Sequence, residues 1–351
     1  MRVATFNLYQ FLEPPFHWYE RKDSGKNTYS ESQWTAKTAW ITTQLAAMNA
    51  DVVGFQEVFS IGALQQLTAA AGYPHFATVD VPGRDDNDDE VFFNPVVAIA
   101  SRYEFADVAE LTVDDELRAF LPVEDGFDFS RRPLCATVET PEFGEVTVYV
   151  AHLKSKRPQM DDITYPDEMP WRDRVLDTMR KLSRGHVGSL LQRGAEAAVV
   201  YLRISETLEA NEKAPVVVLG DLNDKSDSVV LQSITMSQRI HEVGGVKKAD
   251  WPPGVAGQFY RFRLADAFHM APDETGEERP GTHMWDKKWS TLDYVLVSDV
   301  FSPRSPNSIG QVTEFEVLNE HVDNDGVGNK TQSDHGQVVV ELSKLVPDGP
   351  S

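Results

Sequence analysis

Short apolar runs recur along the chain and predict β-strands. Each run is rich in β-branched or aromatic residues and ends in polar, Gly or Pro positions, as strands of a buried sheet do. The runs cover residues 3–8, 52–55, 134–140, 146–153, 216–220, 291–298 and 337–342. Residues 141–144, with sequence Pro-Glu-Phe-Gly, separate the third run from the fourth and predict a hairpin.

Longer segments with apolar residues at helical spacing lie between these runs. Ser30 and Gln33 form a capping-box pattern that predicts a helix over residues 32–49. A second helix is predicted over 172–211, and another should begin near 228. The apolar face expected for the helix at 172–211 consists of Leu190, Leu191, Ala198, Leu202, Ser205 and Leu208. Strands that alternate with helices and hairpins predict an α/β fold in which helices cover mixed sheets.

The chain shows neither tandem repeats nor a Pro- or Ser-rich linker, so one domain is the simplest interpretation. We expect residues 1–345 to form this domain with loop insertions, and residues 346–351 to form a short C-terminal tail. The acidic run 85–90 is expected to be a solvated loop, because adjacent like charges cannot be buried together.

Charge and cysteine content exclude several classes of protein. The 351 residues include 33 Lys and Arg against 55 Asp and Glu, a formal charge of −22. Such a chain does not coat nucleic acid through a general basic surface, although a local basic cleft remains compatible with it. Because Cys135 is the single cysteine, intramolecular disulfides and thiolate zinc clusters are excluded.

The sequence contains no apolar run long enough to cross a membrane and no sign of an obligate protein partner. We expect a cytoplasmic location, although a removed leader peptide would leave no trace in this sequence.

Polar residues with catalytic or metal-binding chemistry follow many of the predicted strands. They are Asn7, Glu57, His152, Asp221, Asn223, Asp293, Asp334 and His335. Each residue alone has an ordinary explanation as a turn or strand-end residue. Loops at strand ends, however, are the positions from which a rigid sheet can bring reactive groups together. The repeated placement therefore predicts a single site.

The sequence resembles the endonuclease/exonuclease/phosphatase superfamily, the metal-dependent phosphoesterases related to DNase I. The matching segments, in the order that the family has, are Thr5-Phe6-Asn7, Gly54-Phe55-Gln56-Glu57-Val58, Ala151-His152-Leu153-Lys154-Ser155, Gly220-Asp221-Leu222-Asn223-Asp224, Leu292-Asp293-Tyr294-Val295-Leu296 and Ser333-Asp334-His335. The resemblance implies a four-layer α/β sandwich, in which two packed mixed β-sheets are flanked by helices.

The resemblance also implies a role for each residue. Glu57, Asn7 and Asp334 would hold Mg²⁺ or Mn²⁺, ions that prefer hard oxygen ligands. Asp221 and Asn223 would position the attacking water, and Asp293 would orient His335. His335 would act either as the base or as a stabiliser of phosphate charge. His152 would contact a phosphate oxygen or protonate the leaving group, and a histidine here favours the DNase I-like branch over abasic-site nucleases. The number of metal ions stays open.

Other residues are candidates for substrate binding. Lys154, Lys156 and Arg157 follow His152, and Arg131 precedes the hairpin, so these cations could attract phosphate. Arg131 could equally be a solvated loop residue. Trp285 lies shortly before Asp293 and could either stack on a base or fill the core. The family commonly has Arg where this chain has Ser290 and Thr291, so a phosphate contact at that position is not inherited.

Three functions are compatible with these residues. The first is a divalent-metal-dependent phosphodiesterase that acts as a nuclease on DNA or RNA. The second is a phosphoesterase for a small phosphate compound or a phospholipid head group. The third is an inactive binding scaffold, and the complete set of acidic and histidine positions argues against it.

Overall fold

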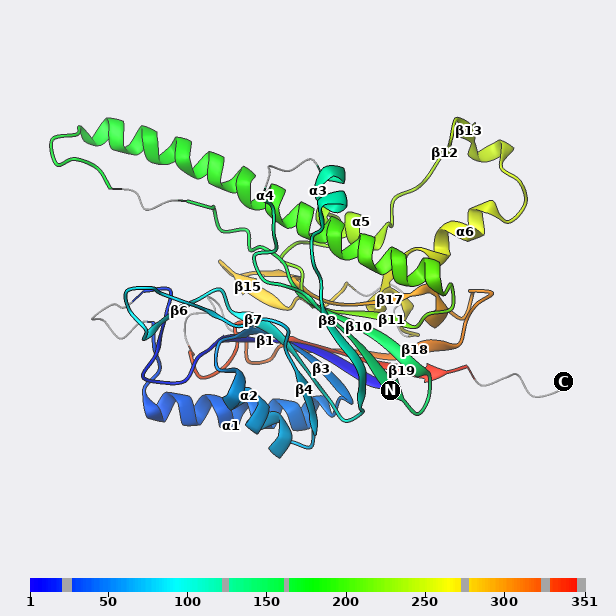
Figure 1. Cartoon of the computed structure of the whole chain (residues 1–351), viewed down its shortest axis with the longest axis horizontal. Coiled ribbons are helices and arrows are strands. Elements are labelled where there is room, and N and C mark those ends of the chain that lie inside the picture. Colours follow the sequence, from blue (N-terminus) through cyan, green and yellow to red (C-terminus); the bar gives the residue numbers. More distant parts are fainter. Residues whose placement is uncertain (21–26, 122–125, 161–163, 273–277, 323–328, 346–351) are drawn as a thin grey trace.

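The computed structural model describes all residues except 21–26, 122–125, 161–163, 273–277, 323–328 and 346–351. Its centre consists of two six-stranded mixed sheets that pack face to face (Figure 1). The predicted tail at 346–351 lies outside the described residues.

The first sheet has the strand order β18-β19-β1-β3-β7-β4. The strands are β1 (Arg2–Phe11), β3 (Val52–Val58), β4 (His75–Ala77), β7 (Val96–Ser101), β18 (Gly310–Leu318) and β19 (Gln337–Lys344). β1 pairs in parallel with β3 and antiparallel with β19. The carboxyl ends of β1 and β3 and the amino end of β19 therefore lie at one edge of this sheet.

The second sheet has the order β14-β17-β11-β10-β9-β8. Its strands are β8 (Phe105–Glu110), β9 (Leu134–Thr140), β10 (Gly144–His152), β11 (Val216–Asp221), β14 (Leu264–Asp266) and β17 (Asp293–Ser298). β9 and β10 form the predicted hairpin. β10 and β11 are parallel, and β17 is antiparallel to β11.

Helices cover the outer faces of both sheets, which gives four layers. α1 (Glu31–Met48) and α2 (Ile61–Ala70) pack on the first sheet, and α4 (Trp171–Ala210) and α5 (Val229–Thr235) pack on the second (Figure 1). The sheets pack tightly at Gly54, where an added Cβ would lie 3.0 Å from the Leu219 Cβ. The predicted four-layer α/β sandwich is confirmed.

Smaller elements decorate the loops. They are β2 (His17–Trp18), β5 (Gly83–Arg84), β6 (Val91–Phe93), β12 (Glu242–Val243), β13 (Val246–Lys247), β15 (His283–Trp285), β16 (Lys288–Ser290), α3 (Asp115–Phe120), α6 (Val255–Arg261) and the 3-10 turns Lys248–Asp250, Ala267–Met270 and Asp299–Phe301. Residues 85–90 form the loop that the sequence predicted.

The predicted helix at 172–211 exists as α4, and its predicted apolar face is right only in part. Leu208 is buried and Ala198 and Leu202 pack against the core, but Leu190 and Leu191 do not. Leu190 and Leu191 are exposed, at 49% and 57%, whereas the buried side chains in the second half of the helix include Arg193, Glu196 and Val200. The buried Arg193 and Glu196 form ionic and hydrogen bonds to neighbouring loops, and apolarity alone could not identify that face.

Crossing a bilayer requires a helix that is both long and predominantly apolar. None of the helices in the described part of the chain has both properties.

Candidate active site

Three neighbouring strands of the second sheet present polar side chains in a row at the site. Strand register pairs His152 with Asp221, and Asp221 with Asp293. Because side chains alternate between the two faces of a strand, these three continue the inward-facing rows of the core between the sheets. His152 Nε2 lies 3.4 Å from Asp221 Oδ2, and all three residues are buried.

The first sheet supplies Asn7 and Glu57 from the opposite side. The Asn7 side-chain amide donates to Asp221 Oδ2 at 3.1 Å, which joins the two sheets across the site. Regular pairing breaks between Asn7 and Phe11 in β1 and around Glu57 in β3, where Glu57 has a φ of 61°. Such irregularities redirect side chains. Here the backbone amide of Gln10 donates to Glu57 Oε2 at 2.8 Å.

His335 is fixed from two sides. Its Nδ1–H donates to Asp293 Oδ2 at 2.8 Å, and its backbone amide donates to Ser333 Oγ at 3.0 Å. The Ser333 hydroxyl in turn donates to the Asn7 carbonyl at 2.7 Å. The Asp293 amide donates to the Thr282 hydroxyl at 3.2 Å. The predicted pairing of Asp293 with His335 is thus present in the structure.

The ionisation of this cluster follows from burial and neighbouring charge. Burial lowers the pKa of His335, but Asp293 and Asp221 outweigh it and raise the pKa well above its usual value. Burial raises the pKa of Asp221 to about 7, although His335 partly opposes this change. His152 is different, because burial and then Arg131 lower its pKa well below the usual value. At neutral pH His335 is therefore an imidazolium and His152 a neutral imidazole.

The oxygen donors of Asn7, Glu57 and Asp334 suit a hard divalent cation. Burial raises the pKa of Asp334 to about 6, with His335 opposing this change and the negative charge of Glu57 adding to it. A bound cation would offset the effect of the Glu57 charge on Asp334. Their chemistry thus fits Mg²⁺ or Mn²⁺, and Asn7 offers an amide oxygen that also accepts from the Tyr9 amide at 3.0 Å.

Asn223 lies beside Asp221 at the end of β11. Its amide donates to Asp221 Oδ1 at 2.9 Å, and its side chain donates to the Leu153 carbonyl at 3.0 Å. These bonds tie the end of β11 to the loop after β10. That loop is also held by α4, because Glu196 accepts from the Lys154 amide at 2.6 Å and Arg193 donates to the Lys154 carbonyl at 3.2 Å.

The cations predicted to bind substrate differ in their surroundings. Arg131 contacts the Leu153 carbonyl at 3.5 Å. Burial lowers the pKa of Lys154, and the positive charges of Arg131, Arg193 and Arg157 also lower it, while Glu196 opposes them. Lys156 instead forms an ion pair with Asp224 at 2.9 Å.

The aromatic residue predicted near the site is on the surface. Trp285 is 66% exposed and does not fill the core. It lies at the end of β15, two residues beyond His283, so both side chains project from the same side of the strand.

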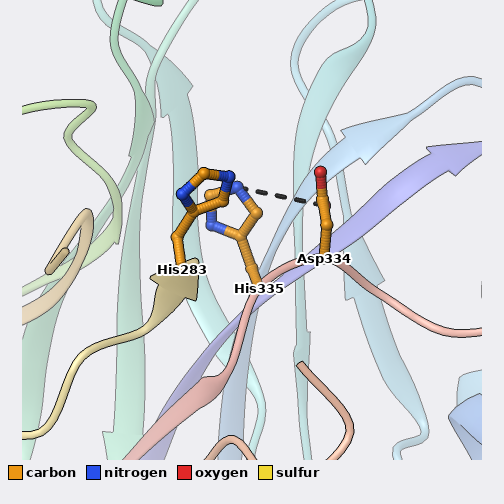
Figure 2. Close-up of side chains that lie close together, drawn as sticks. All are labelled: His283, Asp334 and His335. Carbon is orange, nitrogen blue, oxygen red and sulfur yellow. Dashed lines mark ion pairs between the residues drawn. The ribbon is translucent and has the colours of Figure 1, made fainter. Parts of the chain in front are cut away.

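Sequence reasoning missed His283 and Lys37. The His283 ring lies 5.0 Å from the His335 ring, between centroids, and Figure 2 shows it beside His335 and Asp334. Its position two residues before Trp285 was the available signal. Lys37 lies fully buried in the apolar stripe of α1, where it donates to the Gln332 carbonyl at 3.2 Å. A lysine on an apolar helix face was the signal there.

Solved structures share this fold. The human Nocturnin catalytic domain with bound sulfate superposes with a TM-score of 0.56 at 16% identity, over 98% of this chain and 94% of that one. A mannosyl-6-phosphatase from Bacteroides thetaiotaomicron gives 0.53 at 18% identity, over 97% and 99%. D. rerio TDP2 complexed with single strand DNA product gives 0.50 at 15% identity, over 98% and 99%.

The comparison with curated proteins gave no significant match. A sequence model described as "Endonuclease/Exonuclease/phosphatase family" matches residues 4–335. This match begins just before Asn7 and ends at His335, so it spans every strand end that contributes to the site. Family members are hydrolases of phosphoester bonds, and this chain belongs to the endonuclease/exonuclease/phosphatase family.

Proposed function

We propose that this protein hydrolyses phosphodiester bonds with the help of a divalent cation, and that its substrate is a polynucleotide. The observation that carries the proposal is the placement of His335. Its Nε2 lies 3.9 Å from Asp221 and 4.0 Å from Asp334, both beyond hydrogen-bond range. The charged Nε2–H is therefore available to a phosphate oxygen of the substrate.

The two ionisation states assign the roles. Asp221, with a pKa near 7, can take a proton from the attacking water, while Asn223 holds the Asp221 carboxylate in place. The imidazolium of His335 stabilises the negative charge that develops on the phosphate, and Asp293 keeps the imidazole ring oriented and protonated. The protonated state of His335 favours a role in stabilising the phosphate charge over a role as the base.

His152 and the leaving group complete the reaction. As a neutral imidazole, His152 binds a phosphate oxygen rather than storing a proton for the leaving group. Water forms the new P–O bond, the bond to the leaving oxygen breaks, and that oxygen takes a proton from solvent. Asn7, Glu57 and Asp334 would hold the cation, which when bound supplies positive charge to the phosphate oxygens.

The choice of a polynucleotide rests on the charges beside the site. Arg131 and Lys154 both lower the pKa of His152, and Arg157 lowers the pKa of Lys154, so positive charge acts on this part of the site. Such charge suits a substrate with several phosphates. Exposed Trp285 offers an aromatic face to a base. The solved structures with this fold act on substrates as different as a mannosyl phosphate and DNA, so the shared fold does not decide the substrate.

Hydrolysis of plasmid DNA, single-stranded DNA, RNA, bis(p-nitrophenyl) phosphate and mannose 6-phosphate, each with Mg²⁺ or EDTA, tests the proposal. We expect Mg²⁺-dependent cleavage of at least one polynucleotide, which His335→Ala abolishes. His241→Ala serves as a matched control, because His241 is exposed outside the site. Cleavage of a small ester, with no cleavage of any polynucleotide, would show that the substrate is not a polynucleotide. Absence of metal-dependent hydrolysis would support a binding scaffold.

A further inference from the structure

Helix α4 buries a set of residues that do not belong to the apolar core. They are Gly185, Ser189, Arg193 and Glu196, and the two charged side chains are only 4% and 1% exposed. Their spacing of four, four and three residues places them on one side of the helix. Burial of a charge is costly unless the group is hydrogen-bonded, so the partners of this side of the helix indicate its role.

The first two of these residues hold the far end of the loop that follows β10. The Gln159 amide donates to the Gly185 carbonyl at 3.0 Å, and the Ser189 hydroxyl donates to the Arg157 carbonyl at 2.5 Å. A Cβ on Gly185 would lie 2.5 Å from the Gln159 carbonyl oxygen, so the absence of a side chain allows the loop to lie directly on the helix.

Glu196 joins this loop to a second segment. Its Oε2 accepts from the Lys154 amide at 2.6 Å, and its Oε1 accepts from the Ser130 amide at 2.8 Å. An ionised carboxylate can accept at both oxygens, whereas a neutral side-chain amide has a single acceptor oxygen. The carboxylate thus fixes the backbone at Lys154 and the backbone beside Arg131 relative to each other.

Arg193 joins the same loop to the end of β11. Its Nη1 donates to the carbonyls of Lys154 and Ser155 at 3.2 and 3.4 Å, and its Nε donates to Asp224 Oδ2 at 3.1 Å. The other oxygen of Asp224 forms the ion pair with Lys156 at 2.9 Å. One buried guanidinium therefore connects both segments through several bonds.

The catalytic cluster is held by different contacts. Backbone pairing of β10 with β11 fixes His152, and the Leu153 amide continues it by donating to the Asp221 carbonyl at 3.0 Å. Burial is the largest influence that lowers the pKa of His152, and the charges of Arg131 and Lys154 add to it. The segments held by α4 thus carry cations whose charge acts at the site, while the reacting groups depend on the sheet.

We propose that Arg193 and Glu196 are positioning residues for substrate binding, because they hold the backbone from which Arg131 and Lys154 reach the phosphates beside the scissile bond of a polyanionic substrate. This role rests on the proposed hydrolysis of polynucleotides. A polynucleotide presents several phosphates to these cations, whereas a small ester presents one, so the two kinds of substrate should respond differently.

Glu196→Gln tests this role because it preserves the size of the side chain but cannot accept from both amides. We expect the KM for single-stranded DNA to rise at least ~10-fold, and the dependence of log KM on log salt to become shallower by about 1, as loss of a phosphate contact does. The kcat for DNA, and both constants for bis(p-nitrophenyl) phosphate, should change by less than ~3-fold. Glu209→Gln, on the exposed side of α4, is the matched control.

A double-mutant cycle separates positioning from a general loss of stability. Lys154→Ala should raise the KM for single-stranded DNA in the native protein and raise it less in the Glu196→Gln protein, because a displaced cation has less binding to lose. Arg193→Lys is a second variant, since one ammonium group cannot replace the forked guanidinium that bonds to Asp224 and to the loop carbonyls. It should also raise this KM.

Fluorescence anisotropy of a labelled oligothymidylate in EDTA measures binding without hydrolysis. We expect Glu196→Gln to raise the Kd at least ~10-fold. Wild-type protein that binds the oligonucleotide but hydrolyses no phosphodiester would reject the proposed function and support the positioning role. Hydrolysis of bis(p-nitrophenyl) phosphate without oligonucleotide binding would overturn the positioning role alone. An unchanged KM in Lys154→Ala or in the folded Glu196→Gln or Arg193→Lys proteins, or additive effects in the cycle, would also overturn it.

Discussion

Replacing Asp293 by Asn removes the charge that keeps His335 protonated while it preserves the size of the side chain. In the native protein, burial lowers the pKa of His335 and Asp293 is the strongest influence that raises it. Without this carboxylate the burial effect remains and only Asp221 and Asp334 oppose it, so the pKa falls and less imidazolium is present at neutral pH. Loss of one hydrogen-bond donor that stabilises transition-state charge typically lowers the rate about 10²–10³-fold. The barrier should therefore rise by roughly 3–4 kcal/mol.

The assay is Mg²⁺-dependent hydrolysis of bis(p-nitrophenyl) phosphate from pH 5.5 to 8.5. The wild-type rate should rise with pH through about 7, as Asp221 loses its proton. The ratio of variant to wild-type rates should increase as the pH is lowered, because acid restores the imidazolium in the variant. Asp107→Asn is the control, since Asp107 is exposed on β8. If the Asp293→Asn rate falls less than threefold, and the ratio of variant to wild-type rates does not change with pH, Asp293 does not act through the charge on His335.

Three further predictions concern the metal, the buried acid and the strand contact. Glu57→Gln should raise the Mg²⁺ concentration for half-maximal activity at least ~10-fold, as removal of an ionic ligand does, while Glu209→Gln should not change it. Asp221→Asn should abolish turnover and leave the circular dichroism spectrum unchanged. Burial raises the pKa of Asp221 to about 7, so the native protein keeps a proton that the unfolded chain releases near pH ~4. The free energy of unfolding therefore falls as the pH rises between these two values. At pH 8, without metal, urea unfolding should therefore give the Asp221→Asn variant a free energy of unfolding up to ~4 kcal/mol higher than that of the wild type. Equal free energies of unfolding would contradict this. Gly220→Ala should lower the free energy of unfolding by at least ~2 kcal/mol, because its Cβ would lie 2.1 Å from the Ala151 carbonyl oxygen. Gly62→Ala, where a Cβ meets nothing within 4 Å, is its control.

Much of the catalytic cluster could be predicted because strand periodicity fixes the direction of side chains. His152, Asp221 and Asp293 continue the alternating rows of their strands, so periodicity places each on the buried side of its own strand, and the strand register then makes them neighbours. The position of Glu57 could not be derived in this way, because irregular pairing and a left-handed backbone conformation redirect its side chain. Periodicity assumes regular pairing, which fails at this point.

Helix α4 shows a second limit of sequence reasoning. Apolar periodicity in α4 identified a helix, yet Leu190 and Leu191 face solvent because this part of the helix extends past the sheets. An apolar stripe indicates contact with something, but it does not say whether the contact lies within the same chain. Polar anchors such as Arg193 and Glu196 have no apolar signature at all.

The central claim is that residues from strand ends throughout the chain act as one metal-dependent catalytic site. Hydrolysis of single-stranded DNA and bis(p-nitrophenyl) phosphate by wild-type, Glu57→Gln, Asp221→Asn and His335→Ala proteins, with Mg²⁺ and with EDTA, measures this directly. We expect Mg²⁺-dependent cleavage by the wild type, and its loss by at least about 10²-fold in the Asp221→Asn and His335→Ala proteins. Cleavage that is insensitive to EDTA, or that persists at the wild-type rate in both variants, would contradict it.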